Sequence, residues 1–157
     1  MVAIVFVAIT CFALQKSARQ VFNAVNRERW AASAPAATAL SPAIRWAPEM
    51  IQGWHYSLVS TDRIANFGFA SASTATASIG GPPTRDAPHL GIKAGDPSMM
   101  EVSICGVYWS INLDGELLLT EPDSDYSARL RLVYIDDRIA SVWNATLGES
   151  EKYIRTP

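Results

Sequence analysis

The spacing of hydrophobic positions along this chain changes twice. Residues 1–14 form an uninterrupted apolar run, and from Leu14 to about residue 34 apolar side chains recur every three or four positions. From Trp54 onward they alternate with polar side chains. The first two patterns predict a helix and the third predicts strands. Because no glycine or proline interrupts residues 1–34, we expect one continuous helix that ends near Ala34 and Pro35.

The alternating part of the chain predicts β-strands. Residues 54–58 and 64–69 are expected to form two strands, and the segments 101–113, 116–120, 126–135 and 138–143 are expected to form a three- or four-stranded antiparallel meander. Asp114-Gly115 is a favoured two-residue hairpin turn, and Asp136-Asp137 is expected to form a second tight turn. We interpret residues 144–157 as a loosely ordered tail that contains at most one edge strand, at residues 152–154.

Two segments have the composition of connections. Residues 35–50 are rich in alanine and proline and are predicted to be a linker, with Trp46 docking on the core. Residues 71–99 combine small side chains with Gly80-Gly81 and several prolines, which predicts a long surface loop. Since this loop carries no cluster of reactive groups, we expect it to face a partner and not to be catalytic.

The amino-terminal run MVAIVFVAI resembles the middle of the first helix of type IV pilins and pseudopilins. Alone it would span roughly 21 Å as a helix, against a hydrocarbon core of about 30 Å. The leader glycine, the first phenylalanine and the glutamate that mark the family are absent, so we expect the sequence to start inside the mature helix. Restoring about six residues would give the roughly 20 apolar positions of a transmembrane helix. The resemblance extends over about the first 30 residues.

The resemblance implies an α+β fold class, in which a long helix, apolar and then amphipathic, packs on a small antiparallel β-sheet. The expected divisions are a membrane and packing helix at 1–34, a linker at 35–50 and a β domain at 51–157. The helix residues implied to mediate membrane insertion and assembly are Val5, Phe6, Ile9, Phe12, Leu14, Val21, Phe22 and Val25.

The function implied by the resemblance is that of a non-enzymatic structural subunit. It would be a minor pilin or pseudopilin of a type IV pilus, a type II secretion system or a related fibre. Its partners would be other pilin-like subunits, an inner-membrane assembly platform and membrane lipid. The expected location is the bacterial inner membrane, crossed once, with the β domain in the periplasm or in an assembled fibre.

Composition and candidate chemistry change this picture little. The chain has 157 residues, a net charge of −2 and no Lys/Arg cluster, which argues against a nucleic-acid partner. His55 and His89 lack neighbours at metal-ligand spacing. Cys11 and Cys105 are interpreted as small buried hydrophobic residues. We therefore predict no catalytic residue, no cofactor, no metal and no small-molecule substrate.

Three short motifs have structural interpretations that compete with functional ones. Asp123-Ser-Asp125 resembles the start of a calcium loop but lacks its glycine and its distal glutamate, so a turn cap is preferred to metal binding at a sheet edge. Asp136 and Asp137 are a carboxylate pair that fits a turn. Asn144-Ala-Thr146 matches a glycosylation acceptor, a match that is common by chance.

Two other functions compete with the fibre subunit. In the first, the protein is a membrane-tethered, β-rich binding or scaffold domain of an envelope complex. In the second, it is a virion-type assembly subunit whose apolar helix packs against another subunit. An enzymatic role ranks last, because so few histidines cannot supply a Ser–His–Asp set.

Overall fold

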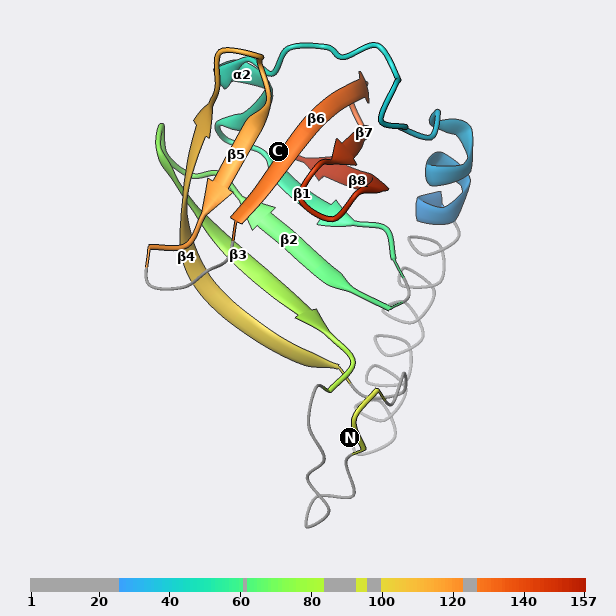
Figure 1. The fold of residues 1–157 in the computed structure, drawn as a ribbon, viewed down its shortest axis with the longest axis vertical. Coiled ribbons are helices and arrows are strands. Elements are labelled where there is room, and N and C mark those ends of the chain that lie inside the picture. The colour runs from blue at the N-terminus through green and yellow to red at the C-terminus, as the bar shows by residue number, and fades with distance from the viewer. Residues whose placement is uncertain (1–25, 61, 84–92, 96–99, 123–126) are drawn as a thin grey trace, which may run out of the picture.

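A computed structural model describes residues 26–60, 62–83, 93–95, 100–122 and 127–157 of the chain. In these residues eight strands follow one another around a closed barrel (Figure 1). The strands are β1 (His55–Leu58), β2 (Ile64–Gly68), β3 (Thr74–Gly81), β4 (Glu101–Ile111), β5 (Leu117–Thr120), β6 (Ser127–Ile135), β7 (Ile139–Asn144) and β8 (Glu149–Thr156). A short helix, α2 (Pro48–Ile51), precedes β1, and residues 26–33 are also helical.

Every strand pairs antiparallel with its neighbour in sequence, and β8 closes the barrel by pairing with β1. In that last ladder Tyr56 is opposite Arg155 and Leu58 is opposite Tyr153. Because successive side chains point to opposite faces of a strand, residues that are paired across a ladder share a face. The register therefore fixes which side chains point into the barrel.

The middle of the barrel is filled with aromatic side chains. Tyr56, Phe67, Phe69, Trp109 and Tyr153 are buried there, and their contacting rings lie 5.8–6.5 Å apart between centroids. These separations fall in the range that favours edge-to-face and tilted packing. The free space among these rings and their aliphatic neighbours is about 10 Å³. An eight-stranded barrel is just wide enough for side chains to fill it, and this one is filled at its centre.

The end of the barrel next to α2, here called the helix end, is covered by the segment before β1. Trp46 is buried, and its Nε1 donates a hydrogen bond of 2.9 Å to the carbonyl oxygen of Leu130. The predicted docking of Trp46 on the core is thus confirmed. The Asp114-Gly115 hairpin is confirmed as well: it joins β4 to β5, and Gly115 has a φ of +81°. Positive φ suits glycine, which has no Cβ.

The helical residues 26–33 lie against the outside of the barrel. Trp30 and Ala34 pack there on Ile139 of β7 and Ile154 of β8. Lys152 Nζ donates hydrogen bonds to the carbonyl oxygens of Ala31 and Ala34, the latter at 2.6 Å. A cation at the last carbonyls of a helix satisfies acceptors that have no partner within the helix. This small second core explains why β7 is buried on both of its faces.

The predicted α+β fold class is wrong. In the described part of the chain the helices are short, and the β-sheet closes on itself, so the main core lies inside the barrel and not between a sheet and a long helix. The sequence pattern also assigned two strands to irregular structure. Residues 74–81, expected within the loop at 71–99, form β3, and residues 149–156, expected within a loose tail, form β8.

The predicted single-pass location in the inner membrane, with its pilin-type transmembrane helix, is also corrected. Among the residues that the structure describes, no helix combines the length and the apolar character that are needed to cross a bilayer. The apolar run at 1–14 on which the prediction rested lies outside those residues. The same is true of all the predicted assembly positions, namely Val5, Phe6, Ile9, Phe12, Leu14, Val21, Phe22 and Val25.

Candidate functional site

The inner face of β8 carries three charged side chains. The alternation of β8 points Glu149, Glu151, Tyr153 and Arg155 to the same side, and the burial of Tyr153 in the aromatic core identifies that side as the interior. Glu149 lies at the end of the barrel opposite α2, here called the mouth, and Arg155 lies at the helix end. Charged groups are rarely buried without partners, so each of these positions needs a structural explanation.

Glu151 is the most deeply buried acid of the mouth, with its side chain 3% exposed. Its Oε1 accepts hydrogen bonds from Arg63 Nη2 and, at 3.1 Å, from Asn144 Nδ2. Its Oε2 accepts one from the Tyr153 hydroxyl at 2.7 Å. The donors come from the segment before β2, from β7 and from β8 itself. The carboxylate is therefore held in one orientation by three different parts of the barrel.

Arg63 bridges two carboxylates. Its Nη1 lies 2.7 Å from Glu149 Oε1, while its Nη2 binds Glu151. Partial burial alone would lower the pKa of the guanidinium, but the hydrogen bond and charge of Glu151, together with the charge of Glu149, raise the pKa above its ordinary value. Arg63 is consequently a permanent cation at the mouth. The group as a whole, two carboxylates and one guanidinium, has a net charge of −1.

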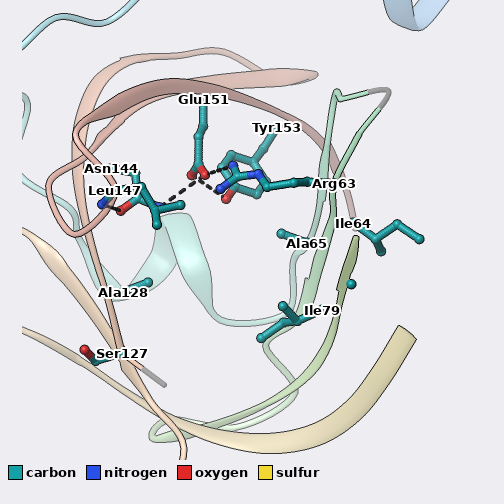
Figure 2. A pocket seen from close by; sticks show the side chains of 11 residues that line it. Arg63, Ile64, Ala65, Ile79, Ser127, Ala128, Asn144, Leu147, Glu151 and Tyr153 are labelled. Carbon is teal, nitrogen blue, oxygen red and sulfur yellow. Dashed lines mark hydrogen bonds and ion pairs between the residues drawn. The ribbon is translucent and has the colours of Figure 1, made fainter. Parts of the chain in front are cut away.

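A cavity of about 300 Å³ opens beside Arg63 and Glu151, which form one of its walls (Figure 2). Small and aliphatic side chains form the rest of its surface. The register pairs Ala65 with Ile79 on the inner face, and Ala128 faces inward beside them because it is paired with the buried Leu119. Figure 2 shows Ile64 pointing away from the cavity. The full lining consists of Arg63, Ile64, Ala65, Ile79, Gly80, Ser127, Ala128, Asn144, Leu147, Glu151 and Tyr153.

Gly80 allows β3 and β4 to approach each other closely beside this cavity. A Cβ at this position would lie 2.1 Å from the carbonyl oxygen of Glu101 on β4, a distance at which the two atoms would overlap. No residue other than glycine fits there without movement of the backbone. The Gly80-Gly81 pair is thus part of the wall of the barrel.

A second depression, of about 350 Å³, lies on the outer side of Arg63. It is lined by Asp62, Glu149 and Ser60 from the rim, by Lys152 and by Ala31 of the docked helix. Arg63 and Glu151 line both this outer pocket and the mouth cavity. The Arg63 side chain therefore separates the largely apolar mouth cavity from the acidic outer pocket.

Arg155, at the helix end, has structural partners. Its guanidinium carbon lies 4.1 Å from the centre of the Trp54 ring, and Nε donates to the Tyr56 hydroxyl at 3.1 Å. Nη2 donates to the carbonyl of Met50 at 3.3 Å, and Nη1 donates to the carbonyl of Asp136. These contacts tie β8 to the α2 segment and to the β6–β7 turn. They leave the mouth as the end of the barrel that is open to a ligand.

The residues singled out from the sequence do not come together in a site. His55 lies on the outer face of β1. Asp136 makes the predicted turn, with Oδ1 accepting from the backbone amides of Arg138 and Ile139. Asn144 is buried in the Glu151 network, which removes the glycosylation motif from the surface. His89, Asp123 and Asp125 lie outside the described residues.

Cys105 is partly buried on the inner face of β4. Burial and the nearby Glu121 raise the pKa of its thiol, which is therefore protonated at neutral pH. In the described ranges, no three histidine, cysteine or acidic side chains come close enough together to hold a metal ion.

Sequence reasoning missed Arg63, Glu151 and Asn144 as site residues. The ion pair at the centre of the group joins residues that are distant in sequence, since 88 positions separate Arg63 from Glu151. One local signal was present, because Glu149 and Glu151 occupy the same face as Tyr153 in an alternating segment. Acids on the aromatic face of a strand indicate a polar group inside a barrel or sandwich.

Comparison of the chain with protein-family models, with curated proteins and with solved structures found no match in any of the three.

Proposed function

We propose that this barrel is a binding module that holds one small, largely apolar ligand in the mouth cavity. The observation that carries the proposal is an open cavity of about 300 Å³ placed above a filled aromatic core. Its volume lies at the lower end of the range of small-molecule sites, which are mostly apolar with a few fixed polar groups. Glu151, Asn144 and Arg63 are such groups, and their mutual hydrogen bonds hold them in place before a ligand arrives.

The cavity is better suited to binding than to catalysis. The two carboxylate oxygens of Glu151 already accept three hydrogen bonds from protein donors, which hold the group in a structural role. The thiol of Cys105, the described nucleophile candidate on the inner face of β4, is held in its unreactive form. The expectation that the protein is not an enzyme accordingly stays part of this proposal. The expectation that the protein has no small-molecule substrate is replaced by the proposal of a small-molecule ligand that is bound and not converted.

Filling the cavity with a larger side chain should weaken ligand binding. Ala65→Phe places a ring into the space that faces Ile79, and we expect it to weaken binding of N-phenyl-1-naphthylamine, a neutral fluorescent probe, by more than about tenfold. The matched control is Asn66→Phe, which adds the same ring to the outer face of β2 and should leave the affinity unchanged. Fluorescence titration measures both, and circular dichroism verifies folding. Equal binding by the two variants would place the probe elsewhere.

A second candidate function, assembly with further copies of the chain, is supported by the outer face of β4. Val102, Ile104 and Tyr108 are exposed there, and Ile104 is 73% exposed. Their cross-strand neighbours on β3 are the small residues Gly80, Ser78 and Thr74, so the apolar side chains stand clear of the sheet. A row of exposed apolar groups on one strand is typical of an interaction surface.

Assembly through β4 predicts that Ile104→Glu shifts the protein from oligomer to monomer, because a charge would be buried at the contact. Sedimentation velocity at several concentrations measures this shift. Leu40→Glu is the control, since Leu40 is 95% exposed and lies in the segment before α2. A wild-type protein that sediments as a monomer at all concentrations would remove this second function.

A further inference from the structure

The charge at the mouth selects among small ligands. Glu149 and Glu151 share the single guanidinium of Arg63, so the group carries a net charge of −1, with Glu151 lining the cavity and Glu149 lining the outer pocket. A carboxylate oxygen can accept two hydrogen bonds, and the Tyr153 hydroxyl supplies one to Glu151 Oε2. A ligand with an N–H donor and a positive charge would complete both the hydrogen bonding and the charge balance. An anionic ligand would be repelled by the same two carboxylates.

Arg63 is the most easily displaced member of this group. It lies directly before β2 and not within a strand, and its side chain is 31% exposed, against 3% for Glu151. The outer pocket beside it offers Asp62 and Glu149 as alternative partners, and Glu149 already binds Nη1 at 2.7 Å. Rotation of the guanidinium toward the outer pocket would therefore keep one ion pair while exposing Glu151 to the cavity.

We propose that the ligand of the mouth cavity is a small organic cation, a primary amine or amidinium attached to an apolar body. Arg63 occupies the position of this cation at Glu151 until the ligand displaces it. This inference rests on the proposed binding function and adds to it the class of ligand and an internal competitor. The ammonium or amidinium group takes over the hydrogen bond to Glu151, and the apolar body lies against Ala65, Ile79 and Ala128.

A matched set of three ligands tests the charge preference with the wild-type protein. 1-Naphthylmethylamine, 1-naphthalenemethanol and 1-naphthoate share one ring system and are cationic, neutral and anionic at pH 7. Isothermal titration calorimetry should show the amine binding about tenfold or more tighter than the alcohol, with the carboxylate weakest, since hydrogen bonds between charged groups are about twice as strong as neutral ones. In Glu151→Gln the preference for the amine over the alcohol should fall to about twofold or less.

If Arg63 competes with the ligand for Glu151, removing Arg63 should increase the affinity for the ligand. Arg63→Met removes an ion pair, yet we expect it to tighten binding of the amine by about tenfold, because the ligand no longer competes with the guanidinium for Glu151. The affinity for the neutral alcohol should stay within about twofold. If Arg63→Met does not fold, Arg63→Lys serves instead, since an ammonium lacks the planar fork with which the guanidinium binds Glu149 and Glu151 through two separate nitrogens, and it should give a smaller gain of the same sign.

The outcomes separate this inference from the proposed function. Equal binding of the three ligands, or tightest binding of the carboxylate, would overturn the cationic ligand and leave the binding function standing. Weaker binding of the amine by Arg63→Met would overturn the competitor role and identify Arg63 as a ligand contact. If none of the three ligands bound and N-phenyl-1-naphthylamine did not bind either, both the inference and the binding function would fail.

Discussion

Arg155→Ala is expected to lower the free energy of unfolding by about 3–5 kcal/mol. The substitution removes a charged donor from the carbonyl oxygens of Met50 and Asp136, of which Met50 also accepts from the Tyr56 hydroxyl, and hydrogen bonds to charged groups contribute about 1.5–3 kcal/mol. It also removes the guanidinium from the face of Trp54, a contact worth up to about 2 kcal/mol when it is shielded from water. Urea unfolding followed by tryptophan fluorescence measures the change.

Arg138→Ala is the matched control. The Arg138 guanidinium also lies over an indole, 5.1 Å from the centre of Trp30, but the side chain is on the surface of the barrel. We expect its loss to cost less than about 1 kcal/mol, as for exposed cation–π pairs. If the two alanine variants unfolded at the same urea concentration, Arg155 would not fasten β8 to the helix end.

The same substitution should alter the titration of Tyr56. Burial raises the pKa of its hydroxyl above 10.0, and the charge and hydrogen bond of Arg155 partly oppose that shift. Without Arg155 the pKa should rise further. A tyrosine with a raised pKa in the folded state binds its proton more tightly than in the unfolded chain, so its contribution to stability is complete below pH 10 and is lost as the pH rises beyond that value.

The strands with an apolar inner face were predictable from the sequence. Alternation located β2, β4, β6 and β7 to within a few residues, and Asp114-Gly115 located the hairpin between β4 and β5. These are local signals, because period-two hydrophobicity and turn chemistry depend on neighbouring residues only. Trp46 was also recognisable, since a large aromatic residue in an alanine-rich segment has few environments other than the core.

The sequence pattern did not predict β3 and β8, because many residues on their inner faces are small or charged. The inner positions of β3 include Ala75 and Ala77, which fit against bulky aromatic neighbours such as Phe67 but carry no strand signal. Those of β8 include Glu149, Glu151 and Arg155, whose charged partners or carbonyl acceptors include residues far away in the sequence, such as Arg63 and Met50. Without β8 the remaining strands form an open sheet, and an open sheet calls for a covering helix. The predicted α+β fold followed from that missing strand as much as from the amino-terminal resemblance.

The candidate site was unpredictable for a related reason. Closing the barrel brings the segment before β2 to the start of β8, and only then does Arg63 reach Glu149 and Glu151. Neither the cavity nor its charge exists in any local stretch of sequence. The pairing of β1 with β8 thus closes the barrel and forms the cavity on which the proposed function depends.

Ile154→Pro tests the closure of the barrel directly and should prevent folding or lower the free energy of unfolding by more than about 3 kcal/mol. Ile154 is paired with Ser57 of β1 on one side and with Ile139 of β7 on the other. Because β8 has a neighbour on both sides, the amide of Ile154 lies within a ladder whichever way it points, and proline has no N–H to donate. Circular dichroism and thermal unfolding of the purified variant measure the effect.

Ile154→Val separates the backbone effect from the side-chain effect. It keeps the amide and a β-branched side chain in the small core with Ile139 and Ala34, so it should cost only about 0.5–1.5 kcal/mol. A loose tail would tolerate both substitutions, because an unpaired backbone has no ladder to lose. A native-like Ile154→Pro variant would therefore reject the closed barrel, and with it the mouth cavity. Loss of folding in the proline variant alone would show that the last strand completes the structure.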